Sequence, residues 1–211
     1  MNYSDALIVV DDLRSRIEPA CEPGFDMICG SIRRLKRDVH DGEIIAKPLG
    51  VRPTPRFGEK IFDTHLDKIL YGLETEGLLR SIKGGQKMKQ YWVRVEDYGL
   101  QALNGFKIEF YIVTPPAQWG VLSVIRTGPN SDDDAFSRWC VTNRSSGGGL
   151  PDGYKVKHGA VWTLEQLDSK LEPLKGETPM VMNTEIEFLN FVGLDWIEPQ
   201  SRHAPRQHVT R

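Results

Sequence analysis

Apolar residues recur at helical spacing in two long stretches of the chain. Between residues 4 and 18 the apolar positions are Leu7, Ile8, Val10, Leu13 and Ile17. Ser4 is a candidate N-cap, and Pro19 and the pair Pro23-Gly24 are stop signals. The second stretch, residues 61–80, places on one face Leu66, Ile69, Leu70, Leu73, Leu78 and Leu79. The spacing predicts a helix over 4–18 and a helix or helical pair over 61–80.

Between these stretches and after them, β-prone runs are bounded by Gly and Pro. "FDMIC" and "DGEIIAKP" predict strands over 25–29 and 41–48, with a Gly30-Ser31 turn between them and a Pro- and Gly-rich loop from Pro48 to Gly58. "KGGQKMKQYWVRV" predicts a hairpin arm after Gly84-Gly85, and "FKIEFYIVTPP" a strand stopped by two prolines. We therefore expect an α+β domain over residues 1–116, in which helices pack on a mixed sheet.

The remainder, residues 117–211, predicts a smaller α+β subdomain. "WGVLSVIRTGP" leads to an acidic loop at 132–134 and a helix over 135–142. The run "RSSGGG" lacks the spacing of a phosphate-binding loop, and we interpret it as a flexible connector. Residues 154–162 predict a hairpin, and 183–199 a capped terminal helix with an aromatic face. We expect the tail after Pro199 to be loosely held.

Composition limits the class of protein. With 211 residues, 27% charged residues and no apolar run of about 20 residues, the chain is expected to be soluble and not membrane-bound. Its three cysteines lack metal-ligand spacing, which favours a cytoplasmic location. The net charge of −2 does not by itself indicate nucleic acid. Basic residues are nevertheless clustered, and the cluster at 33–37 directly precedes two acids.

Those two acids suggest chemistry. Asp41 and Glu43 stand at i and i+2 of one predicted strand, so their side chains point to the same face. Two such carboxylates repel unless a cation lies between them, and Mg²⁺ prefers oxygen ligands of this kind. Glu109 lies in an otherwise apolar strand, where an acid is costly unless it is paired or binds metal. These three residues are the candidate metal ligands and catalytic residues.

The basic loop complements the acids. Gly30 permits close approach of the backbone, Ser31 offers a hydroxyl, and Arg34 offers a forked donor for phosphate oxygens. Phosphates could thus bridge the loop and the metal. The combination indicates phosphoryl or nucleotidyl transfer assisted by two metal ions, without a nucleophilic side chain.

At this point the residues resemble the nucleotidyltransferase superfamily and, within it, the X-family DNA polymerases. "GSIRRLKRDVHDGE" is similar to the family's Gly-Ser, Arg-Arg and acid-x-acid signature, and Glu109 in "KIEFYIV" falls where the family has its third metal acid. "RTGP" resembles the Thr-Gly turn beside the incoming nucleotide, and "TEIEFLNFVGLDWIEPQSRH" resembles the end of the thumb. The resemblance covers a palm and a thumb only, so we expect a minimal form of the polymerase.

The resemblance implies roles for particular residues. Gly30, Ser31, Arg34, Thr127 and Gly128 would bind the nucleoside triphosphate. Arg138 and Lys107 would contact DNA, which we expect to be a primer–template or gapped DNA bound weakly and with strong salt dependence. The implied activity is addition of a deoxynucleotide to a primer 3′-hydroxyl, in the manner of a phage or bacterial repair polymerase acting as a monomer.

The chain departs from the family pattern at the metal positions. Glu43 and Glu109 stand where aspartate is usual, and the extra methylene favours Mn²⁺ as an alternative to Mg²⁺; His40 replaces a glycine before the first acid. Two other functions therefore remain open. One is a nucleotidyltransferase acting on RNA, a protein or a small molecule. The other is an accessory protein that binds nucleic acid with little or no catalysis.

Overall fold

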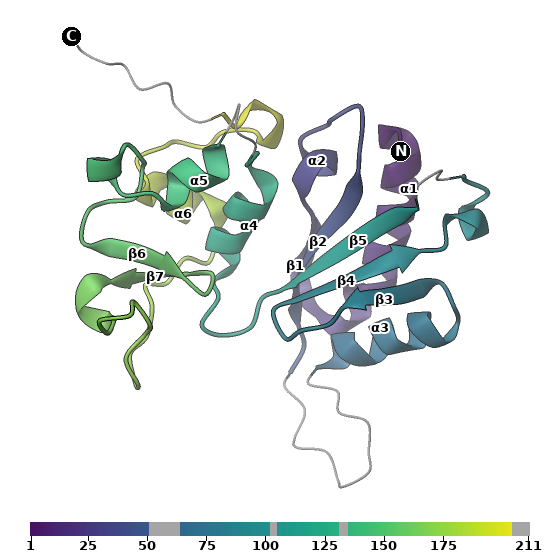
Figure 1. Cartoon of the computed structure of the whole chain (residues 1–211), viewed down its shortest axis with the longest axis horizontal. Helices are drawn as coiled ribbons and strands as arrows, with labels where there is room; N and C mark the ends of the chain where they lie inside the picture. The colour runs from purple at the N-terminus through teal and green to yellow at the C-terminus, as the bar shows by residue number, and fades with distance from the viewer. Residues whose placement is uncertain (51–63, 102–104, 131–134, 204–211) are drawn as a thin grey trace, which may run out of the picture. The chain divides into compact units, whose positions relative to one another are not determined.

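The computed structural model describes residues 1–50, 64–101, 105–130 and 135–203. The chain divides into two compact units, Met1–Thr114 and Pro115–Arg211. The boundary lies two residues before the one placed from the sequence. Both units combine helices with strands, and the first contains a mixed five-stranded sheet packed by helices. The class of the fold is therefore α+β (Figure 1). The loop after Pro48, the acidic loop and the tail lie largely or wholly outside the described residues.

The described residues of the first unit form three α-helices, two 3₁₀ turns and five strands. In chain order they are α1 (Tyr3–Ile17), η1 (Glu18–Ala20), β1 (Cys21–Ile28), α2 (Gly30–Arg33), β2 (Asp41–Pro48), α3 (His65–Thr75), β3 (Leu79–Lys83), β4 (Met88–Val93), η2 (Val95–Tyr98) and β5 (Phe106–Ile112). The strands are ordered β1-β2-β5-β4-β3. Among these described strands, β2 and β5 pair in parallel, and the other neighbours are antiparallel.

Helices α1 and α3 cover one face of this sheet. Every second residue of the central strands points into the core with them: Ile44 and Ala46 from β2, and Phe106, Ile108, Phe110 and Ile112 from β5. From α1 the core takes Ala6, Val9, Val10, Leu13 and Ile17. Because strand side chains alternate, the intervening residues lie on the opposite face, where β2 and β5 carry Asp41, Glu43, Lys107 and Glu109.

The predicted strands over 41–48 and 106–112, the helix over 4–18 and the hairpin after Gly84-Gly85 are confirmed. Residues 61–63 of the helix or helical pair predicted over 61–80 lie outside the described residues. The prediction is confirmed over His65–Thr75 but was wrong beyond it, because α3 ends at Thr75 and Leu79 begins a strand. Gly77 adopts a φ of +75° between them, a conformation that ends a right-handed helix. Leu78 and Leu79 are nevertheless buried, because a residue can face the core from a turn or a strand as well as from a helix.

Two other predictions needed correction in the same unit. β1 begins at Cys21, because a bulge between Cys21 and Asp26 accommodates Pro23 and Gly24 within the strand. The Gly30-Ser31 turn is the start of the short helix α2, and the amide of Arg34 donates to the carbonyl of Gly30 at 3.2 Å. The turn is thus a strand-to-helix junction.

In the second unit the described residues form three α-helices, three 3₁₀ turns and a two-stranded sheet. Its elements are α4 (Trp119–Thr127), α5 (Phe136–Val141), η3 (Arg144–Ser146), β6 (Tyr154–Lys157), β7 (Ala160–Thr163), η4 (Leu164–Gln166), α6 (Glu185–Phe191) and η5 (Pro199–Ser201). The predicted helix over 135–142 and the hairpin are confirmed. The terminal helix predicted over 183–199 begins with a capping box between Thr184 and Glu187 but ends at Phe191, so its second half was wrong. The sequence did not predict α4.

The run "RSSGGG" was wrongly interpreted as a flexible connector. It forms η3 followed by closely packed glycines: a Cβ on Gly148 would lie 1.9 Å from the carbonyl oxygen of Thr142, and one on Gly149 2.3 Å from the Trp139 ring. These glycines are therefore needed for contact, and composition alone cannot distinguish close packing from flexibility.

A buried ion pair closes the second unit. Arg202 is 1% exposed, and its Nη1 donates to Glu185 Oε1 at 2.9 Å, while its Nε donates to the carbonyl of Ile197 at 3.1 Å. The guanidinium also lies over the ring of Trp196, 5.4 Å from its centroid. These contacts attach the segment that follows α6 to the first turn of that helix.

We expect Glu185→Ala to lower the free energy of unfolding by about 3–5 kcal/mol, because it leaves a buried guanidinium without its carboxylate. Urea unfolding checks this, with the exposed Glu165→Ala as the control that should change little. The double variant Glu185→Leu/Arg202→Met should recover most of the loss. A small effect of Glu185→Ala would contradict the assignment of this pair as the closure of the unit.

Candidate active site

Three of the predicted site residues lie together on the face of the sheet away from α1 and α3. Because β2 and β5 are parallel, Glu43 is the direct partner of Glu109, and Asp41 is the direct partner of Lys107. Direct partners in adjacent strands point to the same face at about 4.8 Å spacing. The sheet thus brings Asp41, Glu43 and Glu109 to one face, although Glu109 lies 66 positions after Glu43 in the sequence.

Gly30 is required by both its backbone and its neighbour. Its φ is +62°, in the left-handed region, and a Cβ there would lie 1.4 Å from Glu43 Oε2. The carboxylate of Glu43 therefore fills the space that any side chain at residue 30 would take. In addition, the amide of Cys29 donates to the carbonyl of Glu43 at 2.9 Å. The Gly-Ser junction is held directly against the second acid of the acid-x-acid pair.

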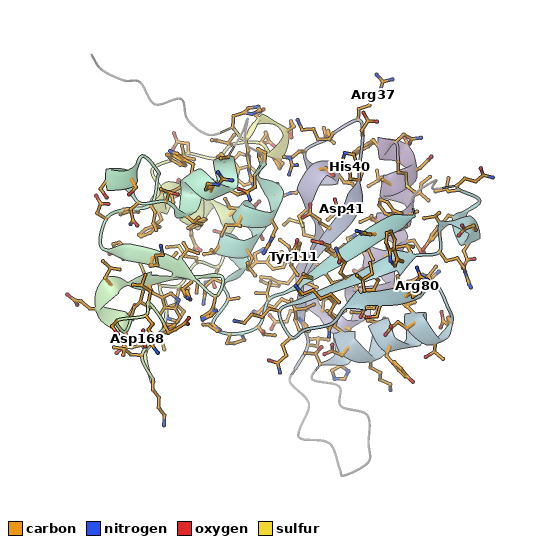
Figure 2. All side chains as sticks on the ribbon, viewed as in Figure 1. Arg37, His40, Asp41, Arg80, Tyr111 and Asp168 are labelled. Carbon is orange, nitrogen blue, oxygen red and sulfur yellow. The ribbon has the colours of Figure 1, made fainter. Side chains whose placement is uncertain are left out.

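Ser31 places a hydroxyl beside this contact. Its Oγ is shielded from solvent and has no hydrogen-bond partner among the residues that the structure describes. A buried hydroxyl without a partner is costly, so an acceptor from a ligand would relieve it. Arg34 is half-buried at the C-cap of α2. By contrast, Arg37 lies at the exposed end of the loop between α2 and β2 (Figure 2).

Glu109 is held by two neighbours that the sequence analysis did not identify. Gln90 Nε2 donates to Glu109 Oε1 at 2.6 Å, and the Tyr111 hydroxyl donates to Glu109 Oε2. Gln90 is the β4 residue directly opposite Glu109, whereas Tyr111 follows it by two residues on the same strand. The alternation of side chains along β5 could have placed Tyr111 on the same face as Glu109. The contact with Gln90 could not be predicted in this way, because it depends on the register between β4 and β5.

Burial and the charge of Glu109 raise the pKa of the Asp41 carboxyl, while His40 and Lys107 oppose the shift. The carboxylates on this face therefore interact unfavourably when both are ionised. This is the electrostatic condition that binding of a cation would relieve.

The donor set fits a divalent cation in chemistry and in backbone position, since three carboxylates share one face. The three carboxylate groups, however, are not grouped around a common point. Within the described parts of the chain, no three carboxylate, imidazole or thiol groups stand close enough together to hold an ion. Both oxygens of Glu109 are instead engaged by Gln90 and Tyr111. Glu109 would have to leave these partners, at least in part, to join Asp41 and Glu43 around a metal.

The remaining predicted site residues belong to the second unit. Thr127 is the buried last residue of α4, and Gly128 is its C-cap. A Cβ on Gly128 would lie 2.4 Å from the ring of Phe136. The hydroxyl of Ser137 lies 2.6 Å from the carbonyl oxygen of Ile125 and 2.9 Å from that of Gly128. The Thr-Gly turn is thus fixed by α5, on which Arg138 is exposed.

No protein-family model matches this chain, and no curated protein is significantly similar to it. The described helices include none that is both long and apolar enough to cross a membrane. Function must therefore be argued from the chemistry of the site.

Replacing Gly30 tests the contact with Glu43. We expect Gly24→Ala, also at positive φ (+78°) but with open space around the new Cβ, to cost about 1–2 kcal/mol of unfolding free energy. Gly30→Ala should cost more, because it adds a clash with Glu43 to the same backbone strain. Urea unfolding of the two variants makes the comparison, and equal losses would contradict the proposed packing.

The raised pKa of Asp41 predicts a specific dependence on pH. Because the folded protein holds this proton more tightly than the unfolded chain does, the ionised carboxylate lowers stability as the pH rises above about 3.9. Asp41→Asn should therefore increase the free energy of unfolding at neutral pH, with the gain disappearing below that value.

Asp152 is the matched control, because its hydrogen bonds with Ser145 lower its pKa. Asp152→Asn should change stability in the opposite direction, with a loss at neutral pH that fades in acid. Urea unfolding at several pH values distinguishes the two, and a neutral-pH loss for Asp41→Asn would contradict the electrostatic interpretation.

Proposed function

We propose that this protein is a metal-dependent nucleotidyltransferase that adds a deoxynucleotide to a primer 3′-hydroxyl, as a minimal relative of the X-family polymerases. One observation carries the proposal: the Glu43 carboxylate is packed onto Gly30 of the Gly-Ser junction while Glu109 stands directly opposite it in a parallel strand pair. A phosphate-binding turn and an acidic cluster are thereby joined in one site.

The junction supplies the phosphate-binding half. The missing side chain of Gly30 lets the Glu43 carboxylate pack against the junction, and the buried Ser31 hydroxyl beside it lacks a hydrogen-bond partner among the described residues. Arg34, at the C-cap of α2, has the planar guanidinium that binds two phosphate oxygens at once. These groups would orient the triphosphate of the incoming nucleotide, which is the positioning that phosphoryl transfer requires.

Asp41, Glu43 and Glu109 would hold Mg²⁺ or Mn²⁺. When bound, such an ion would lower the pKa of the primer hydroxyl that attacks the α-phosphate and neutralise charge on the pyrophosphate that leaves. Until then, Gln90 and Tyr111 keep Glu109 in a defined orientation. In the second unit, Thr127 and Gly128 would contact the incoming nucleotide. Lys107 and the exposed Arg138 would contact the DNA backbone, and both carry the positive charge that phosphates attract.

A second function is favoured by the engagement of Glu109. Because both of its oxygens have partners and no three ligands converge among the described residues, the protein could bind nucleic acid without turnover. Normal DNA binding with no nucleotide transfer in either metal would support this alternative.

We expect the wild-type protein to extend a labelled primer on a one-nucleotide gap in Mg²⁺ or Mn²⁺. Asp41→Ala should reduce the rate by more than about 100-fold, the upper limit typical for loss of a group that merely supports a metal ligand. Asp38→Ala, which removes an exposed carboxylate from the loop just before β2, is the control that should retain activity.

Single-stranded DNA and labelled triphosphates with RNA, protein or small-molecule acceptors complete the experiment. Transfer to one of these acceptors alone would identify a nucleotidyltransferase other than a DNA polymerase. Absence of transfer to any acceptor, from protein shown by circular dichroism to be folded, would contradict the proposed activity.

A further inference from the structure

Cations continue from the carboxylates across the same face of the sheet. Lys107, opposite Asp41, is the direct partner of Trp92 on β4, and Trp92 is the direct partner of Arg80 on β3. In the adjacent row Glu109 pairs with Gln90, and Gln90 pairs with Lys83. Direct partners share a face, so Lys107, Arg80 and Lys83 lie on the face that bears the acids.

We name Lys107, Arg80 and Lys83 the cation row. The Lys107 ammonium lies over the Trp92 ring, 4.8 Å from its centroid, and this cation–π contact holds it in place. Arg80 and Lys83 are exposed. Figure 2 shows Arg80 on β3, at the opposite side of the sheet from β1.

The cation row differs from the other basic residues near the sheet. Lys89 on β4 is paired with Asp67 of α3 at 2.7 Å, and Lys47 on β2 is paired with Glu22 at 2.6 Å. Arg80 and Lys83, in contrast, have no ion-pair partner within the described ranges. Unpaired cations in line on one face are suited to a polyanion rather than to internal stabilisation.

A depression lies beside the far end of the row. It has a volume of about 290 Å³ and is lined by Gly77, Leu78, Arg80, Trp92, Val93 and Arg94. Asp97 neutralises Arg94 through hydrogen bonds of 2.7–2.9 Å, so Arg80 supplies the uncompensated charge at this depression. The surface at the end of the row is therefore concave, partly aromatic and cationic.

We propose that the cation row binds the phosphodiester backbone of the primer strand and leads its 3′ end to Asp41, Glu43 and Glu109. The binding surface is inferred from the positions of these cations on the sheet. The direction in which the primer strand would run rests on the proposed function. β2 and β3 are separated by three interstrand steps, or about 14 Å. At about 3.4 Å per nucleotide, Arg80 would meet the strand about four nucleotides from its end.

The test is binding of fluorescent oligothymidylate of about eight nucleotides, followed by anisotropy over a range of salt concentrations, in EDTA and without triphosphate. Arg80→Gln/Lys83→Gln should weaken binding at low salt by at least about tenfold and make the slope of log K against log salt shallower by about 1.4, since each phosphate contact to a single strand contributes about 0.7. Oligouridylate should show the same loss, because phosphates are the groups contacted.

Lys68→Gln/Lys170→Gln is the matched control, because it removes the same charge from exposed residues outside this face. It should leave the slope unchanged. Equal losses of affinity in the two double variants would mean that only the net charge matters, and this would overturn the proposal. No loss of affinity in either variant would overturn it as well.

Oligothymidylates of about two to eight nucleotides locate the contact along the nucleic-acid strand, and the gain in affinity with length shown by the wild type should be reduced in Arg80→Gln. Because no metal or triphosphate is present, the cation row can pass this test even if the protein proves unable to transfer nucleotides. Conversely, primer extension could occur while the row fails the test.

Discussion

The parallel pairing of β2 with β5 is the constraint on which the site depends. A parallel pair cannot be closed by a tight turn, so the chain passes through α3, β3 and β4 before β5 returns beside β2. The register that results sets Glu43 opposite Glu109 and Asp41 opposite Lys107. A slip of one residue would turn these side chains into the core beneath α1 and α3, where ionised groups would be far more costly.

The two faces of the sheet in the first unit differ in the residues they carry. One face is apolar and packs with α1 and α3, which stabilises the sheet. The other face is free to carry charges, and they are arranged with carboxylates on the central strands and cations toward β3. Like charges on the central strands lower stability, as the raised pKa of Asp41 indicates. Such a cost is expected where a surface is shaped for binding rather than for folding.

Close packing connects the Gly30-Ser31 junction to the acids. The carboxylate of Glu43 occupies the position of the missing Gly30 side chain, so the turn and the strand cannot move independently without losing this contact. Gln90 and Tyr111 restrain Glu109 in a comparable way from the other side. Glu43 and Glu109 are thus each held by neighbouring residues. Release of Glu109 from Gln90 and Tyr111 is the step that would separate an enzyme from a protein that only binds nucleic acid.

The sequence by itself determined the local features. Alternation identified the strands at 41–48 and 106–112 and placed Asp41 and Glu43 on one face, because a period of two depends only on neighbouring residues. The sequence pattern was misleading at residues 61–80, because Leu78 and Leu79 fitted a helical face although the helix ends before Gly77. It was also misleading at "RSSGGG", because glycines needed for close packing have the same composition as a flexible linker. Only the tertiary structure decided that Glu109 meets Glu43, that Gln90 holds Glu109, and that Lys107, Trp92 and Arg80 align. Those facts depend on the register between strands far apart in the chain, which no local pattern specifies.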